Sequence, residues 1–378
     1  MSTASMNNTI ESPSMEFALD EDQQGLADLA AQIFSSLGTD ELNAAGEKAR
    51  AAYDAALWSQ IAESGLIDAL LPMGEDEPGL GMAGLALVAR EQGRTLGRVP
   101  FITTAVAALA IAEFGGHEQL LEGIGAGSVR IAALQPEVRR RVNGTASGEG
   151  WVLDGAIELG YLVPSATHLM VQFHTEAGEL TALIEANRAG ITLDEYHGLS
   201  RQQHAELAFA GVQVQASDLI GANRGTGQAA AWIRLRLLTA AAALMSGVGA
   251  EALRRTAAYT NERKQFGRAI ATNQGVALRA ADAFIDTETT WLSTIDAAWQ
   301  LDHDGDGAEA ALGASWLARE AGFRVVHTTQ HLHGGMGADL DNHIHRFFVW
   351  MRELDVLWGT AGHVSEELAA VILDGGKA

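Results

Sequence analysis

The residues best suited to chemistry form one short run, Tyr259-x3-Arg263-x-Gln265-Phe266-Gly267. The planar donors of an arginine engage two phosphate oxygens at once, so this run suits a phosphate-bearing ligand. The alternative is structural, with the arginine and the phenylalanine capping a helix end at a packed junction. Residue types alone favour this structural alternative, so the run needs support from the rest of the chain.

A glycine-rich segment, His333-Gly334-Gly335-Met336-Gly337, follows about 70 residues later along the chain, a separation that leaves room for two helices. Glycines let the backbone approach a phosphate group or an adenine ring closely. They also end helices, so a helix C-cap followed by a loop explains the same residues. The two interpretations are compatible, because a capped helix end can also bind a ligand.

Two motifs that suggest metal binding have better explanations. One motif has the spacing of the first ligands of a calcium-binding loop, at Asp302, Asp304 and Asp306. A glycine stands at its twelfth position, where that loop needs a bidentate glutamate. This composition predicts an exposed turn between two helices. His327 and His331 are one helical turn apart, yet they lack the carboxylate of a Glu-x-x-His setting. We therefore predict no metal site.

Composition excludes several classes of protein. The net charge of −23 argues against binding of nucleic acid through its phosphates and against docking on anionic lipid. The absence of cysteine excludes disulfides, thiolate nucleophiles and iron–sulfur clusters. The first residues, Met1 to Ser14, carry no apolar run of the kind a signal peptide needs, and no uncharged stretch is long enough for a membrane span. We expect a cytoplasmic protein.

Hydrophobic periodicity divides the chain into three parts. Helical spacing dominates up to about Gly127, short apolar or alternating runs follow from about Val129, and long helical patterns return from about Gln228. The fold class is therefore α+β: an N-terminal helical domain (1–128), a central small β-barrel or sheet domain (129–222) and a C-terminal four-helix bundle (223–378). Asn143-Gly144 and Asp154-Gly155 are expected to be turns between strands. Residues 235–266 are expected to form one long helix.

The order of these parts, together with a set of spaced motifs, resembles the acyl-CoA dehydrogenase family over nearly the whole chain. No single motif is specific, but the ordered and correctly spaced set is. The motifs are Leu57-Trp58 with Gly65-Leu66, Leu71-Pro72, Gly79-Leu80-Gly81, Glu91-Gln92-Gly93-Arg94, Pro100, Leu134-Gln135-Pro136, Asp154-Gly155, Asp218-Leu219-Ile220-Gly221, Arg263-x-Gln265-Phe266-Gly267, Gln274, Ala281-Asp282, His333-Gly334-Gly335 and His345-Arg346-Phe347-Phe348.

The resemblance implies a reaction and a cofactor. In the family, a base removes the proton alpha to a thioester carbonyl, and the beta carbon gives a hydride to FAD. FAD lies across a subunit interface: one subunit holds the flavin ring, and its neighbour contacts the pyrophosphate and adenine. The positions that match FAD contacts are Arg263, Gln265, Phe266, Gln274, His331, Gly334, Gly335 and Thr360. His331 stands where the family usually has a glutamine.

The catalytic base of the family is missing from this sequence. Trp358 occupies its usual position, and a second position used by some members falls on Leu237 or Leu238. None of these side chains can accept a proton, as a general base must. The other acidic residues considered as a base are expected on solvated helix faces: Glu251, Glu366 and Glu367.

The flavin-ring site also departs from the family pattern. Leu159-Gly160-Tyr161 aligns with a Trp-x-Thr motif that contacts the ring, and leucine cannot replace an indole donor. An alignment error of a residue or two is the alternative. Trp350 and Trp358 are two turns apart on a helical count, so they are expected either to fill the substrate cavity or to anchor an interface.

These departures predict the base-less subunit of a heteromeric acyl-CoA dehydrogenase. A homologous subunit would carry the catalytic glutamate, in an α2β2 assembly that acts on an acyl-CoA, with an electron-transfer flavoprotein or similar acceptor. Subfamily motifs point to steroid side-chain esters. Two alternatives stay open: a self-sufficient homomeric flavin oxidoreductase or monooxygenase on the same fold, and a non-enzymatic scaffold subunit.

Overall fold

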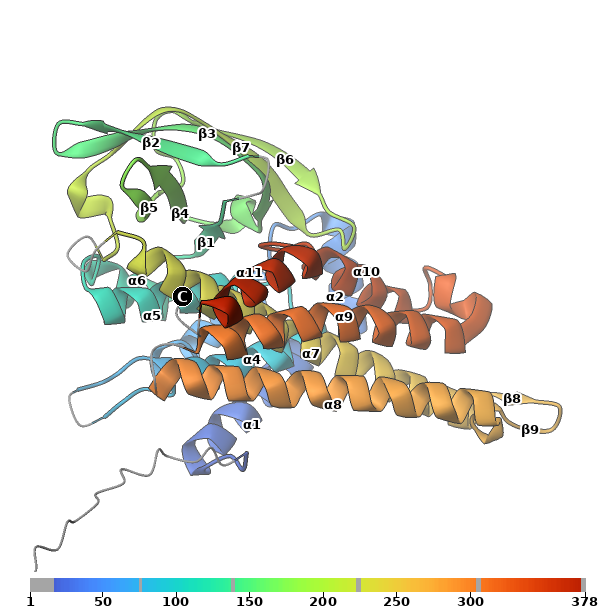
Figure 1. Cartoon of the computed structure of the whole chain (residues 1–378). Coiled ribbons are helices and arrows are strands. Elements are labelled where there is room, and N and C mark those ends of the chain that lie inside the picture. The colour runs from blue at the N-terminus through green and yellow to red at the C-terminus, as the bar shows by residue number, and fades with distance from the viewer. Residues whose placement is uncertain (1–16, 75–76, 137–139, 222–225, 304–306, 375–378) are drawn as a thin grey trace, which may run out of the picture.

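A curved sheet lies over a layer of helices, and the longest helices extend well beyond it (Figure 1). The structure is a computed structural model that describes residues 17–74, 77–136, 140–221, 226–303 and 307–374. Helices come first along the chain, then the sheet, then helices again. This is the α+β architecture predicted from the sequence. Met1 to Ser14 lie outside the described residues.

The N-terminal part is helical, as predicted. Asp20 caps the first helix: its carboxylate accepts a hydrogen bond from the Gln23 amide at 2.8 Å, and the Gln23 side chain accepts one from the Asp20 amide. Two short helices, over Asp40–Ala49 and Gln119–Gly125, were not predicted, because their apolar stripes are too brief to stand out. The helices are α1 (Glu21–Leu37), α2 (Asp40–Ala49), α3 (Ala55–Glu63), α4 (Gly81–Thr95), α5 (Phe101–Phe114) and α6 (Gln119–Gly125).

A seven-stranded mixed sheet follows in the described part of the chain, with strand order β1-β4-β2-β3-β7-β6 and β5 paired to β4. β1 and β4 run parallel, whereas β3 and β7 form a long antiparallel pair that leads toward the helical layer. The strands are β1 (Ile131–Leu134), β2 (Val142–Ser147), β3 (Gly150–Tyr161), β4 (His168–Thr175), β5 (Gly178–Glu185), β6 (Ile191–His197) and β7 (Gln203–Val214).

The two predicted turns in this region are wrong. Asn143-Gly144 lies inside β2, where a side chain at Gly144 would come within 2.5 Å of the Phe173 ring. Asp154-Gly155 lies inside β3 at a register shift, and Gly155 has a φ of 139°. Here glycine provides close packing and a bulge rather than a turn.

Long helices form the C-terminal part. The first of them ends at Glu262, so the predicted helix to Phe266 is four residues too long, and a two-stranded hairpin follows. The elements are α7 (Gln228–Glu262), β8 (Lys264–Gln265), β9 (Arg268–Ala269), α8 (Gln274–His303), α9 (Ala308–His333), α10 (Ile344–Leu354) and α11 (Ala361–Leu373).

Asp302, the first acid of the calcium-like motif, caps a distant helix. Its two carboxylate oxygens accept hydrogen bonds from the backbone N–H groups of Met82 (2.8 Å) and Ala83 (2.9 Å), at the start of α4. A carboxylate at this end of a helix satisfies free N–H groups and favours the helix dipole. Asp304 and Asp306 lie outside the described residues.

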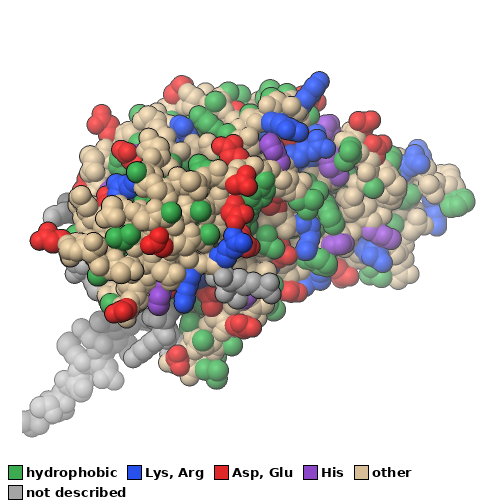
Figure 2. Space-filling model, turned by 90° about the horizontal axis from the view of Figure 1, so that it is seen from above, with side chains coloured by type: hydrophobic (Ala, Val, Ile, Leu, Met, Phe, Trp, Pro, Cys, Tyr) green, Lys and Arg blue, Asp and Glu red, His purple; other side chains and the backbone are tan. Residues whose placement is uncertain are grey.

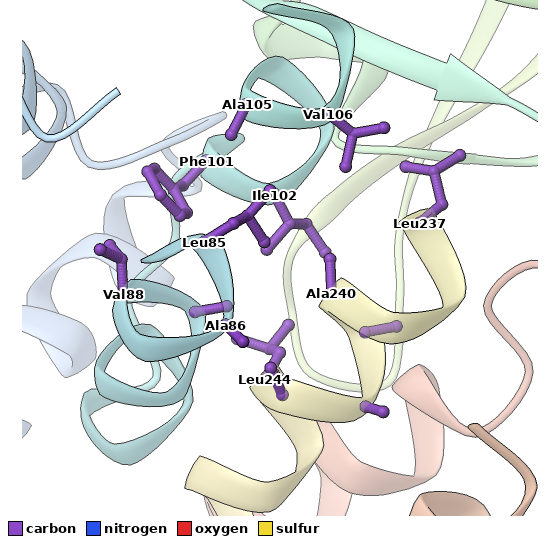
Figure 3. Close-up of a cluster of buried hydrophobic side chains, with 14 of the residues drawn as sticks. Leu85, Ala86, Val88, Phe101, Ile102, Ala105, Val106, Leu237, Ala240 and Leu244 are labelled. Atoms are coloured by element: carbon purple, nitrogen blue, oxygen red, sulfur yellow. The ribbon is translucent and has the colours of Figure 1, made fainter. Parts of the chain in front are cut away.

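Helices α4, α5 and α7 meet in the main apolar core (Figure 3). The α4–α7 crossing is close because both helices carry a glycine there: a Cβ at Gly93 or at Gly247 would lie 2.0 Å from a backbone oxygen of the other helix. By length and composition α7 would be able to cross a membrane, but 83% of its apolar window is buried inside the protein.

Candidate cofactor and active site

The predicted phosphate-binding run forms the end of α7 and the hairpin beyond it. Arg263 follows the last helical residue, and its backbone N–H donates to the carbonyl oxygen of Tyr259 at 2.8 Å. Phe266 and Gly267 form the turn between β8 and β9, both with positive φ, as in the tight turns that suit hairpins. The Phe266 side chain is 100% exposed. The structural alternative of a packed junction is therefore wrong for this phenylalanine.

The hairpin is basic on a chain whose net charge is −23. Arg263, Lys264 and Arg268 are all exposed, as is Gln274 at the start of α8. Basic and apolar side chains gather at the tip of the molecule that carries this hairpin, on the right in Figure 2. The hairpin thus presents cationic donors and an apolar ring to solvent.

The glycine-rich segment lies at the same end of the helical layer (Figure 1). α9 ends at His333, and Gly334 follows with a φ of 60°, so the predicted C-cap is confirmed. The His333 ring stacks on Tyr259 with centroids 4.4 Å apart, which joins this segment to the end of α7. Burial lowers the pKa of His333 and so favours the neutral ring. His331, Gly334 and Gly335 are exposed.

Trp358 lies in a different region, between the sheet and the helices. α10 ends at Leu354, and Trp358 follows in a turn with a φ of 58°, so the helical count that placed it on one face with Trp350 is wrong. Both indoles are nevertheless buried. The Trp358 Nε1–H donates to the carbonyl oxygen of Ala133 at 3.3 Å, which fixes the indole against strand β1.

Tyr161, at the end of β3, packs against Trp358 in an edge-to-face contact with centroids 6.4 Å apart. Its ring also stacks on His204 at 5.6 Å. Burial, aided by the charge of Glu353, raises the pKa of the Tyr161 hydroxyl and keeps it protonated. Tyr161, which aligns with a ring contact of the family, and Trp358, at the usual base position, thus fill the space between sheet and helices with aromatic side chains.

A buried polar cluster beside Tyr161 was not predicted. Glu353, on α10, accepts hydrogen bonds from the Ser200 hydroxyl (2.5 Å) and the Ser200 amide (2.9 Å). His204 Nε2 lies 2.9 Å from the same carboxylate, and the Leu162 amide donates to His204 Nδ1 at 3.4 Å. Burial opposes ionisation of Glu353, but the bonds from His204 and Ser200 outweigh it, so its pKa lies below the ordinary value.

One sequence signal could have revealed this cluster. Glu353 follows Trp350 by three positions on a short amphipathic helix, so the two share the face that packs inward. A carboxylate on such a face needs buried partners. The sequence contains no hint of which residues provide them.

A pocket of about 590 Å³ opens beside Trp358. Thr360 lies at its edge, and its side chain caps α11 by accepting a hydrogen bond from the His363 amide. Because it lines the same pocket as Trp358, it lies apart from the predicted cofactor residues near the hairpin. Arg234, from the start of α7, lines the pocket and donates to the carbonyl oxygen of Trp358 at 3.3 Å. Gln135 reaches the same space from the end of β1.

The other residues considered as bases have structural surroundings. Leu237 and Leu238 are fully buried, and Leu237 lies beside Val106 in the apolar core (Figure 3). Glu251 is not on a solvated face as predicted: it is buried and paired with Arg254 and Arg255. Glu366 is exposed, and Glu367 pairs with Arg234.

Within the described ranges, no three His, Asp or Glu side chains are grouped so that they could hold a metal ion. The His327 ring packs on Phe323, with centroids 4.2 Å apart, and against Phe348 at 4.9 Å. Its aromatic surroundings give it a structural role in the packing of α9 on α10.

The two parts of the site lie at opposite ends of α7. Arg234 contacts Trp358 near the start of this helix, and Arg263 follows its end. At about 1.5 Å per residue, the 35-residue helix is about 50 Å long. An FAD molecule is far shorter, so one bound at the hairpin does not reach the Trp358 region of the same chain.

Comparison with known proteins agrees with this architecture. The chain is 31% identical over 366 residues to acyl-CoA dehydrogenase FadE27 of Mycobacterium tuberculosis, covering 92% of this chain and 96% of that protein. The chain belongs to the acyl-CoA dehydrogenase family. Residues 223–373 of this family member match the description "acyl-CoA dehydrogenase, C-terminal domain".

Several solved structures are similar to this protein over nearly the whole chain. A variant of the Tcur3481–Tcur3483 steroid ACAD is 35% identical, with a TM-score of 0.87 over 94% of this chain and 98% of that one. The ChsE4–ChsE5 complex of Mycobacterium tuberculosis is 26% identical, with a TM-score of 0.88 over 95% and 99%. A glutaryl-CoA dehydrogenase from Mycobacterium smegmatis in complex with FADH2 shares the fold at 19% identity, with a TM-score of 0.82 over 95% and 96%.

Proposed function

We propose that this chain is the subunit of a heteromeric acyl-CoA dehydrogenase that lends cofactor contacts but no catalytic base. A homologous subunit would carry the base, a glutamate, and an intact flavin-ring site. The observation that carries this proposal is the ring region itself: Trp358, which aligns with the family's usual base position, is buried and packs against Tyr161. The exposed hairpin lies too far from Trp358 for one FAD molecule to contact both, so it would contact the FAD of a neighbouring subunit.

The hairpin residues fit the phosphate end of FAD. The Arg263 guanidinium is exposed at the hairpin base and supplies paired donors for a pyrophosphate. Gln265 and Gln274 add side-chain amides nearby, and Gly334 and Gly335 leave the backbone open to close approach. His331 stands beside these glycines. When bound, FAD supplies the redox step by accepting the substrate's beta hydride.

The ring region does not fit a flavin in the same way. The Trp358 indole and the Tyr161 ring occupy the space between β1 and the helices. Trp358 offers no proton acceptor, so we derive no proton abstraction by this chain. Thr360 stands at a position that contacts FAD in the family, but here its hydroxyl caps α11.

Exposed apolar side chains support a partner subunit. Phe266, Leu278, Phe284 and Ile285 are each more than half exposed, on the hairpin and on the neighbouring part of α8. Single exposed apolar residues are ordinary, but a group next to a proposed cofactor site is typical of an interface. An α2β2 assembly would cover it.

The substrate class follows from the solved relatives. One is described as a steroid ACAD and another as a complex of two named chains. We infer the CoA ester of a steroid side chain as substrate, and an electron-transfer flavoprotein or similar carrier as acceptor. The relatives' descriptions and the subfamily motifs of the sequence support this part of the proposal.

Flavin stoichiometry tests the proposal. The chain expressed alone should contain no bound FAD, and its complex with the homologous subunit should contain one FAD per heterodimer. Arg263→Ala should lower the flavin content of the complex without dissociating it. Full flavin content together with thioester dehydrogenation by the chain alone would establish a self-sufficient enzyme instead. Unchanged flavin content in the Arg263→Ala complex would favour a scaffold.

A further inference from the structure

Tyr259 lies in the last turn of α7, between the basic hairpin and the glycine-rich segment. Its carbonyl oxygen accepts the backbone N–H of Arg263 at 2.8 Å, where the chain leaves the helix. Its side chain contacts the glycine-rich segment at two points, His333 and Met336. These two residues directly precede and follow the pair Gly334-Gly335. One tyrosine therefore touches both segments.

We propose that Tyr259 is a positioning residue that holds Arg263 and the Gly334-Gly335 pair in one fixed arrangement, a role that rests on the proposed function of both segments. The arginine and the glycines belong to parts of the chain about 70 residues apart. They serve one FAD molecule only if their relative placement is set by the protein. Tyr259 acts through these neighbours and not through contact with the cofactor.

The contact between Tyr259 and His333 is a close, nearly parallel stack. The ring centroids are 4.4 Å apart, and the two planes meet at 16°. His333 is 6% exposed, and its Nδ1–H donates to the carbonyl oxygen of Thr329 at 2.9 Å, which fixes the orientation of the imidazole. Aromatic rings packed in this way attract each other beyond the area that they bury. The stack thus fixes the end of α7 against the end of α9.

The glycine pair has few contacts of its own. Gly334 has a φ of 60°, and a Cβ at Gly334 or at Gly335 would meet no atom within 4 Å. The position of the pair therefore depends on the residues on either side of it. On one side is the stack of Tyr259 on His333. On the other side the Tyr259 hydroxyl donates to the sulfur of Met336 at 3.7 Å.

Holding the glycines in place before the cofactor arrives favours binding. Glycine loses more conformational freedom than any other residue when its backbone is fixed. A ligand that has to order two loose glycines loses part of its binding free energy to their conformational entropy. Removal of the Tyr259 side chain should therefore weaken FAD binding although every cofactor contact is still present in the sequence.

FAD titration of the deflavinated complex with the homologous subunit tests the proposal. Tyr259→Leu should raise the dissociation constant of FAD about tenfold. Tyr259→Phe keeps the stack and loses only the bond to sulfur, so it should raise the constant about twofold. His333→Leu removes the stack from the other side and should match Tyr259→Leu. Tyr53→Leu removes a tyrosine that packs under Arg130 in the N-terminal part, and this matched control should leave the constant unchanged.

A double-mutant cycle separates positioning from a general structural role. If Tyr259 acts by placing Arg263, Tyr259→Leu should weaken FAD binding less in an Arg263→Ala background than on its own. Additive effects in this cycle, or an unchanged dissociation constant in both Tyr259→Leu and His333→Leu, would overturn the positioning role alone. Unchanged FAD affinity in Arg263→Ala would overturn the proposed function as well, so the two failures give different results.

Discussion

The Glu353 carboxylate lies 2.9 Å from Nε2 of His204 and thereby ties helix α10 to strand β7. Both side chains are buried, with His204 fully inaccessible. The bond is one of several that hold the loop before β7 around this carboxylate. The sheet and the helical layer are therefore joined by a specific polar contact next to Tyr161 and Trp358.

Removing this carboxylate should destabilise the fold. Glu353→Ala leaves the donors of Ser200 and His204 buried without an acceptor, which should lower the free energy of unfolding by about 3 kcal/mol. Urea denaturation measures the change. Glu320→Ala, at an exposed position on α9, is the control and should shift the midpoint little. Equal midpoints for both variants would contradict a stabilising role for the cluster.

The same carboxylate should make stability depend on pH. Because the folded pKa of Glu353 lies below its ordinary value of 4.5, its contribution is complete above pH 4.5 and is lost as the pH falls through the folded pKa. Urea midpoints measured between about pH 3 and pH 7 should fall at the acidic end. In Glu353→Gln the urea midpoint should fall less at the acidic end. If it falls as much as in the unchanged chain, the loss of stability comes from other carboxylates, such as Glu251.

Gly198 should resist substitution because of this cluster. A Cβ there would lie 2.2 Å from Oε2 of Glu353 and 2.6 Å from Nε2 of His204. Gly198→Ala should cost about 1–3 kcal/mol of unfolding free energy through overpacking. In a Glu353→Ala background the cost should be smaller, since the obstructing carboxylate is gone. If the two substitutions change the free energy of unfolding additively, the Cβ at position 198 and the Glu353 carboxylate do not interact.

Restoring a glutamate at the usual base position should not create an active enzyme. Trp358→Glu places a carboxylate in a site that is 8% exposed, removes the bond to Ala133 and leaves Leu159 and Tyr161 in place. We expect a lower melting temperature and no acyl-CoA dehydrogenation by the lone chain supplied with FAD. Trp358→Phe controls for loss of the indole. Measurable turnover by Trp358→Glu would mean that this chain's own ring site is intact.

The exposed ring at the hairpin tip should matter only in the complex. Phe266→Ser should leave the melting temperature of the lone chain unchanged, because the side chain makes no buried contact. In the complex with a homologous subunit it should lower flavin content. Phe17→Ser, at another exposed apolar position, is the matched control and should change neither quantity. Equal flavin content in both complexes would mean that Phe266 does not contact the FAD of the partner subunit.

The parts of the fold predicted from sequence are those with strong periodicity. The apolar runs expected from about Val129 begin with strand β1 at Ile131, and the helical pattern expected from about Gln228 begins with α7 at that residue. β2 and β6 were missed because their faces are largely polar or exposed. Glycines inside β2 and β3 resembled turns, since sequence alone does not show the neighbour that a glycine accommodates.

The candidate site was likewise predicted only in part from the sequence. The hairpin and the glycine-rich helix end were found because their residues are close together in sequence. The cluster of Glu353, Ser200 and His204 joins residues about 150 positions apart, and only the packing of α10 on the sheet reveals it. Glu251 was misplaced for a different reason: Arg254 and Arg255 lie within one turn of it on the same helix, and their pairing makes a buried carboxylate tolerable.

The uninterrupted length of α7 limits how this chain can evolve. A single residue inserted into its middle would rotate everything beyond by about 100° and advance it by about 1.5 Å. Arg263 and the hairpin would then point to another side of the molecule, while Arg234 and Trp358 would stay where they are. Packing constrains the many buried side chains of this helix, and the two structures that it holds in register constrain its residue count as well.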